Sequence, residues 1–376
     1  MKSSNRIFGL DIARLLAMLM MVQGHTVYCL LNNVIVDSQD TFWQIWTFIR
    51  GFTAPVFLMV SGFVHIFVNK RNENGRLTTT IILKRLNVCF VLLLIGYLFQ
   101  LPAQNIFYIP FLSQPILTSF LKVNILQLFS ISLLSLILLF IITKTNKSIA
   151  IISFIIGNGL IFLSHFLLQI NYQNVSLPMA VIQYLTFDYD SIFPVMPFAG
   201  YLYLGVAFGY LLLNIPQEKR NRYILTKFTL FGLVYLVLGL LLSYYYSHGG
   251  YKVLGICKLN IGISVYRVGI SLLVIVFGTL ISSKLLRFER IITILSNRSL
   301  FIYVIHLILI YGTAITPGIR NFFYNVDTFT AFYCAVVVIL FSILLVLLYE
   351  YTYKKPYIKY LYRYLIVAIL IYMLLM

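Results

Sequence analysis

Long unbroken apolar stretches constrain this chain more than any other feature of its sequence. Residues 127–144 and 228–247 are two examples, each with roughly the 20 residues that a helix needs to cross a hydrocarbon core. Of all residues 61% are apolar and 10% are charged, whereas soluble domains are about 45–50% apolar and about 25% charged. A soluble fold is therefore excluded, and so is a transmembrane β-barrel, because its strands would alternate apolar and polar residues. The sequence predicts an all-α fold, a polytopic transmembrane helical bundle.

About ten spans fit this pattern, within a single transmembrane domain at residues 1–364. The expected spans are 8–31, 45–69, 81–101, 123–143, 148–170, 192–213, 225–246, 267–284, 299–316 and 328–350. The apolar tail at 365–376 is shorter than a span, so it is expected to be a partial eleventh span or an interfacial helix.

The positive charge indicates the orientation of the chain. The formal net charge is +18, which in a soluble protein would suggest nucleic acid as a partner. Here Lys and Arg are expected to mark cytoplasmic loops, so no nucleic-acid partner is predicted. With the N-terminus inside, most basic residues fall on the inner side, and the outer ones are Arg50, Lys122, Lys252, Lys258, Arg267 and Arg320. We expect a multi-pass protein of the plasma or inner membrane with a cytoplasmic N-terminus, in contact with membrane lipid.

The first span carries three ionisable residues, Asp11, Arg14 and His25. Ionisable side chains inside a membrane are costly, and they commonly mark functional sites. At about 100° per residue, all three point to one face of a helix, with Arg14 and His25 about 16 Å apart along its axis. Asp11 and Arg14, three residues apart, can pair. A structural alternative is that Arg14 reaches the inner interface, Asp11 neutralises it and His25 makes a polar contact between helices.

Two further stretches carry polar residues within apolar surroundings. In 50–67, Arg50 is expected at the outer end of the second span, Pro55 is expected to kink it, and Gly62 permits close packing. In 296–312, Ser296 or Ser299 can cap a helix whose His306 lies about 10 Å inside the inner boundary. Tyr303 is one turn before His306 on the same face. The alternatives are a bent, tightly packed helix and an ordinary buried polar contact.

Four motifs together resemble the transmembrane acyltransferases, which include acyltransferase family 3 and the heparan-alpha-glucosaminide N-acetyltransferase-like proteins. Family 3 has an arginine, ten residues and a histidine in its first span, and this chain has Arg14 and His25. The other motifs are 53–63, 193–209 and 299–312. The glycines of 193–209 otherwise suggest only a closely packed helix.

The resemblance implies an acyl-CoA donor, with acetyl-CoA favoured, bound on the cytoplasmic side and an acceptor on the outer side. His25 would be catalytic, Arg14 would take part in catalysis and position the donor, and His306, which matches the histidine of the late motif, is the third candidate catalytic residue. Lys84 and Arg85 stand at the start of the third span, where some members have Arg-x-Arg, and they would hold CoA phosphates. Arg50 and Asp11 are the candidate substrate-binding residues.

The chemistry of the residues agrees with this activity. The basic residues Lys70, Arg71, Arg76, Lys84 and Arg85 can bind phosphates. A neutral imidazole can accept a proton from an acceptor hydroxyl or amine, so His25 is a candidate general base. An acyl-histidine intermediate is the alternative route. The four cysteines lack metal-binding spacing, so no metal is expected.

Other functions remain open at this point. A transporter for a lipid or small anion would also bury charges, although the chain shows no internal repeat. A scaffold would need neither Arg14 nor His25. For an acyltransferase, the acceptor can be a glycan, a sugar or a lipid-linked sugar, acylated on oxygen or nitrogen. Glycine-lined helix faces would allow a homodimer.

Overall fold

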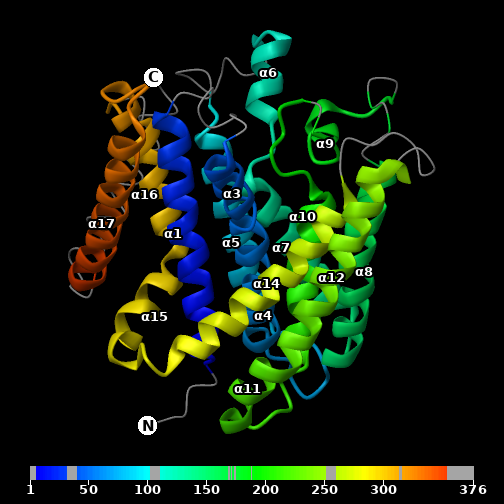
Figure 1. The fold of residues 1–376 in the computed structure, drawn as a ribbon. Coiled ribbons are helices and arrows are strands. Elements are labelled where there is room, and N and C mark those ends of the chain that lie inside the picture. Colours follow the sequence, from blue (N-terminus) through cyan, green and yellow to red (C-terminus); the bar gives the residue numbers. More distant parts are fainter. Residues whose placement is uncertain are drawn as a thin grey trace. The chain divides into compact units, whose positions relative to one another are not determined.

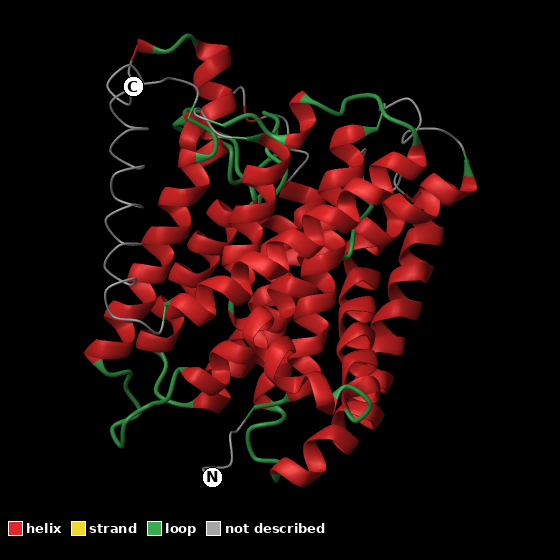
Figure 2. Ribbon diagram, turned by 90° about the vertical axis from the view of Figure 1, so that its left-hand side faces the viewer, coloured by secondary structure: helices red, strands yellow, loops and turns green. Residues whose placement is uncertain are grey.

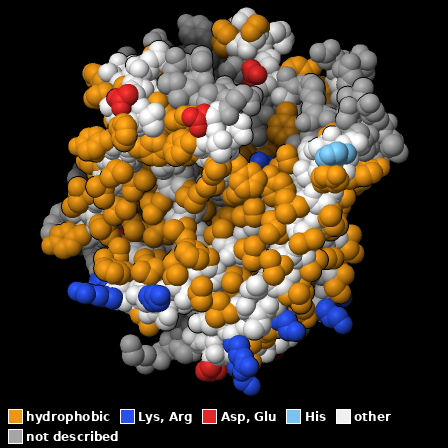
Figure 3. Space-filling view, in the orientation of Figure 1, with side chains coloured by type: hydrophobic (Ala, Val, Ile, Leu, Met, Phe, Trp, Pro, Cys, Tyr) orange, Lys and Arg blue, Asp and Glu red, His pale blue; other side chains and the backbone are white. Residues whose placement is uncertain are grey.

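The computed structural model describes residues 6–31, 40–101, 111–167, 170, 172, 175–187, 189–250, 260–312 and 316–353. Within these residues the regular elements are helices, and no strand is formed (Figure 2). On the face shown in Figure 3, hydrophobic side chains cover most of the described surface, as expected of helices that meet lipid. The prediction of an all-α transmembrane fold is therefore confirmed. The tail at 365–376 lies outside the described residues.

Eight helical stretches of the described chain are long and apolar enough to cross a membrane. They are Phe8–Leu30 (α1), Thr41–Val68 (α3, Thr41–Arg50, and α4, Thr53–Val68), Thr79–Leu98 (α5), Ile125–Ile142 (α7), Asn146–Leu167 (α8), Gln217–His248 (with α11, Gln217–Tyr223, and α12, Thr229–Tyr245), Ile261–Ser282 (α14) and Thr328–Thr352 (α17). A ninth results if Leu286–Asn297, which contains α15 (Glu289–Asn297), and α16 (Ser299–Tyr311) form one span with its bend of 69°. The described chain also contains the short helices α6 (Gln114–Leu121) and α9 (Met179–Ile182).

The expected span at 192–213 corresponds to the shorter helix α10, Val195–Tyr210. Met196, between Pro194 and Pro197, has a non-helical backbone, so the regular helix begins only after this residue. Proline removes a backbone donor and disfavours helical geometry in the residue before it, which explains the late start. The ten expected spans are thus eight or nine of membrane length plus this shorter helix.

The chain folds into two compact units, and each is described by itself. The described residues of unit 1 fall within 6–7, 54–101 and 111–277, and those of unit 2 fall within 8–53 and 278–353. In unit 1, α10 packs on α8 and α7, and α5 packs on α7 (Figure 1).

Glycines set the helix spacing in unit 1. A Cβ atom added at Gly62 of α4 would lie 2.0 Å from the carbonyl oxygen of Leu202 in α10, and one added at Gly205 would lie 2.1 Å from that of Met59. These backbones therefore touch, as small residues allow in membrane helix packing. We call the four residues Met59, Gly62, Leu202 and Gly205 the glycine contact of α4 and α10.

Unit 2 is built around α1. This helix, blue in Figure 1, packs against α15, α16 and α17, which are coloured from yellow to orange-red. Part of this packing is an apolar cluster in which Val27 and Leu30 of α1 meet Trp43 of α3 and Ala331 of α17. The interior of unit 2 thus consists of segments that are distant in the sequence.

Candidate active site

The first-span residues lie on a single continuous helix. α1 runs from Phe8 to Leu30 without interruption, so Arg14 and His25 keep the same face and the expected axial separation of about 16 Å. Arg14 and His25 are both half-buried, whereas Asp11 is buried. The helical arrangement of these three residues therefore agrees with the sequence prediction.

α16 presents the second histidine. The helix starts at Ser299 after the bend, and it ends before Gly312, whose φ of 78° is a backbone conformation that favours glycine. The expected serine cap is wrong: Arg298 occupies the N-cap position, and no side chain caps the helix there. Ser296 instead donates a hydrogen bond to the Asp11 carboxylate over 2.9 Å, which attaches the start of α1 to the end of α15.

The two histidines meet, although 281 positions separate them in the sequence. Nδ1 of His25 lies 3.1 Å from Nε2 of His306, and the ring centroids are 5.3 Å apart. His306 is fully buried and His25 is half-buried. No sequence signal predicted this pair, because helical periodicity describes one helix and does not say which face another helix contacts.

Two neighbours on α16 fix the His306 ring. Nδ1 of His306 donates a hydrogen bond to the carbonyl oxygen of Ile302, 3.0 Å away and one turn earlier. The rings of Tyr303 and His306 pack edge to face with their centroids 5.2 Å apart, and Tyr303 is also buried. The prediction that Tyr303 shares a face with His306 is confirmed.

Arg50 lies close to His25, but not at the end of its span. The second spanning stretch begins at Thr41, earlier than expected, so Arg50 lies in the last turn of α3. The break after α3 falls at Gly51 and Phe52, one turn before Pro55, whose ring would clash with the carbonyl of Gly51 in a continuous helix. The expectation of an interrupted helix is confirmed, and the position of Arg50 at the outer membrane boundary stays a prediction.

Aromatic rings hold the Arg50 guanidinium in place. Its central carbon lies 4.4 Å from the centroid of the Tyr28 ring and 4.8 Å from that of Trp46, both cation–π distances. The aliphatic part of Arg50 passes Gly24, the residue before His25, where an added Cβ would be 3.0 Å from Arg50 Cγ and Cδ. Sequence analysis missed Tyr28 and Trp46, although Tyr28 is one turn from Gly24 and its aromatic type is a usable signal.

The candidate phosphate-binding residues Lys84 and Arg85 belong to unit 1, in the first turns of α5. Lys84 is exposed, and Arg85 is half-buried with its Nε donating to Oδ1 of Asn69 over 3.0 Å. Asn69 is buried, and its side-chain Nδ2 has no hydrogen-bond partner among the described residues. Sequence analysis missed Asn69, whose position between the end of α4 and a run of basic residues is the only local signal.

Arg71, another member of the expected basic surface, has a structural contact instead. Its Nη1 donates to the carbonyl oxygens of Gly75, at 2.8 Å, and Phe140, at 3.0 Å, and its Nη2 donates to the Thr143 hydroxyl at 2.8 Å. Burial in this loop lowers the pKa of Arg71. These bonds connect the loop at Gly75 to the C-terminal end of α7, so Arg71 has few donors left for a phosphate.

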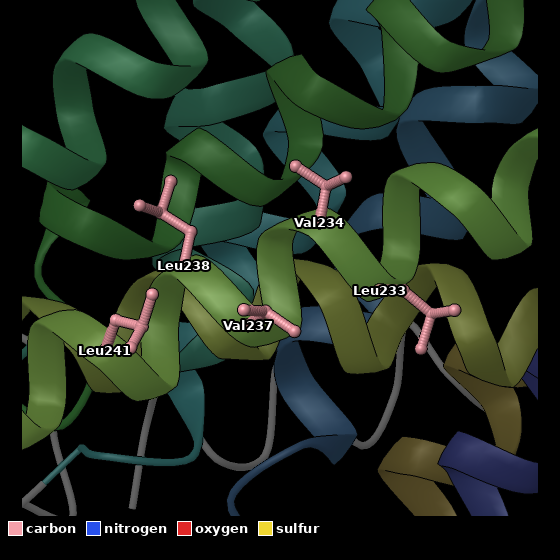
Figure 4. Close-up of a pocket in the computed structure, with 5 residues that line it drawn as sticks. All are labelled: Leu233, Val234, Val237, Leu238 and Leu241. Atoms are coloured by element: carbon pink, nitrogen blue, oxygen red, sulfur yellow. The ribbon is translucent and has the colours of Figure 1, made fainter.

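A hollow on α12 offers no comparable chemistry. Its lining residues, Leu233, Val234, Val237, Leu238 and Leu241, all come from this one helix, and Figure 4 shows only apolar side chains around it. Such a surface fits lipid tails, and it holds no group that can move a proton or bind a charge.

The fold and the histidine pair define a multi-pass membrane protein with a polar cluster inside its helical bundle. The family model for the acyltransferase domain, acyltransferase family 3, matches residues 7–349, which include both histidines and all the helices described above except the end of α17. The chain therefore belongs to this family and is a membrane acyltransferase. No curated protein sequence matches the chain. Family membership favours an enzyme over the transporter and the scaffold.

Proposed function

We propose that the protein transfers an acyl group, preferentially acetyl, from acyl-CoA on the cytoplasmic side of the cell membrane to a hydroxyl or amine of an extracytoplasmic glycan or sugar. The observation that carries this proposal is the pair of His25 and His306, in which one ring is half-buried and the other is fully buried. An imidazole that is both held and accessible suits general base catalysis.

The reaction needs one proton carrier. His25 accepts the proton of the acceptor hydroxyl or amine while the acceptor atom bonds to the thioester carbonyl carbon. The carbon–sulfur bond then breaks, and the imidazolium returns the proton to the leaving sulfur, which gives free CoA. In the alternative route the acyl group first moves to the imidazole of His25.

The surrounding charges support roles around this base. Arg50, close to Gly24 and His25, can stabilise the oxyanion of the tetrahedral intermediate or orient the acceptor. Arg14 lies about 16 Å along α1 from His25, a distance that an extended pantetheine arm can bridge. Lys84, Arg85 and the neighbouring Asn69 suit the phosphate groups of the donor. Asp11 accepts a hydrogen bond from Ser296, and we retain it as a substrate-binding candidate.

Donor-dependent CoA release tests the proposal. Purified protein in nanodiscs is incubated with acetyl-CoA and pooled cell-envelope glycans, and CoA release is measured with and without the glycans. We expect acceptor-dependent release by the wild type and a decrease of about 10²- to 10⁴-fold in His25→Ala, with donor binding retained. His248→Ala, at an exposed position in the last turn after α12, serves as the control and should keep wild-type rates. Folded wild-type protein that binds no acyl-CoA would contradict the donor assignment.

A further inference from the structure

The hydrogen bonds of His306 determine which of its nitrogens carries the proton. Nδ1 of His306 lies 3.0 Å from the carbonyl oxygen of Ile302. A carbonyl oxygen can only accept a hydrogen bond, so this nitrogen must be the donor. In a neutral imidazole the second nitrogen is then an acceptor, and here the second nitrogen is Nε2.

The same reasoning extends to His25. Its Nδ1 lies 3.1 Å from Nε2 of His306. Because Nε2 of His306 has only a lone pair, the proton between the two rings belongs to Nδ1 of His25. The remaining nitrogen of His25, Nε2, is therefore unprotonated.

The burial of the two rings separates their roles. His306 is fully buried and already has a partner at each nitrogen, Ile302 at one and His25 at the other. His25 is half-buried and has a second nitrogen that is not used in this pair. Of these two residues, only His25 is half-buried and keeps a basic nitrogen outside the pair.

We propose that His306 is a positioning residue, which holds His25 in the tautomer with its proton on Nδ1 and its basic lone pair on Nε2. This inference rests on the proposed function and names the reacting atom. The acceptor proton moves to Nε2 of His25 as the new bond to the acyl carbon forms, and the same nitrogen returns it to the sulfur of CoA. His306 neither gains nor loses a proton, so the balance is acceptor plus acyl-CoA giving acylated acceptor plus CoA.

The tautomer can be observed without any enzyme assay. The chain has five histidines, so ¹⁵N-histidine labelling of the full protein in nanodiscs gives a tractable NMR spectrum, in which His25→Ala identifies the His25 signals. We expect an unprotonated Nε2 at His25 in the wild type and a protonated or exchanging Nε2 in His306→Phe. A protonated Nε2 in the wild type overturns the inference even if acyl transfer is detected. If no acyl transfer is detected, the proposed function fails while the NMR result still decides the tautomer.

Kinetics provide the second readout. His306→Phe keeps a ring but removes the acceptor, so we expect kcat to fall about 100-fold or more with KM for acetyl-CoA nearly unchanged. His306→Gln places an amide oxygen where Nε2 stood and should recover most of the lost rate. The control is His65→Phe, since His65 of α4 also lies 2.8 Å from a carbonyl oxygen four residues earlier, that of Ser61. Equal loss in His306→Gln and His306→Phe, or wild-type kcat in His306→Phe, overturns the inference.

Discussion

The contact of α4 with α10 in unit 1 and the contact of α1 with α16 in unit 2 join helices by opposite means. In the glycine contact of α4 and α10, the backbones approach so closely that an added Cβ would lie 2.0 Å from a carbonyl oxygen. Between α1 and α16, two imidazole rings meet, and one of them is half-buried. The first contact has no group that can move a proton, and the second has two.

This difference shows why a conspicuous motif need not contain a reactive residue. The motifs at 53–63 and 193–209 are as prominent in the sequence as the histidine of the first span, yet their glycines lie at helix contacts. Small residues contribute close packing, whereas a histidine in a membrane helix contributes a proton carrier. Substitutions in the two contacts should therefore change different properties, namely folding in one and turnover in the other.

The largest effect on folding is expected from Gly62→Ala. The new Cβ would meet backbone atoms of Leu202, which cannot move without separating α4 from α10, so we expect a loss of about 1–3 kcal/mol in stability. Thermal unfolding in detergent and size-exclusion chromatography measure it. Gly159→Ala in α8 is the matched control, because nothing lies within 4 Å of its added Cβ. Equal stability of the two variants would contradict the tight contact of α4 and α10.

An effect on turnover alone is expected from Arg50→Ala. Its guanidinium lies over Tyr28 and Trp46 near His25, so we expect kcat/KM to fall about 10- to 100-fold, equivalent to about 1.4–2.8 kcal/mol, while the protein stays folded. Steady-state CoA release measures this loss. The control is Arg320→Ala, an exposed arginine with a ring contact to Tyr324 at 5.9 Å. Loss of folding in Arg50→Ala would place Arg50 with the packing residues instead.

The smallest effect is expected from Arg298→Ala. Arg298 stands at the bend before α16 and forms an ion pair with Glu350 of α17, but both side chains are partly exposed. Exposed ion pairs contribute about 0–1 kcal/mol, so thermal unfolding should shift only slightly and CoA release should stay near the wild-type rate. Glu350→Gln tests the same pair from its other side. A large loss of turnover in both variants would mean that this ion pair controls the position of His306.

Local patterns predicted most of the fold and part of the site. The lengths of the apolar stretches located the spans, and the spacing of Arg14 and His25 placed them on one face of α1, because helix geometry depends only on neighbours in the chain. The expected span at 192–213 is the shorter helix α10, since Met196 between two prolines departs from helical geometry. The prediction of a serine cap on α16 was wrong, because Ser296 donates its hydrogen bond to Asp11, a residue 285 positions away.

The sequence by itself determined that this chain is a helical membrane protein, that its first span carries an ionisable face and that its motifs resemble those of the membrane acyltransferases. Only the tertiary structure decided that His25 meets His306, that Arg50 contacts the rings of Tyr28 and Trp46, and that Asn69 forms a hydrogen bond with Arg85. The physical reason is that periodicity and composition follow from bonded neighbours, whereas these contacts depend on how side chains of separate helices pack against one another.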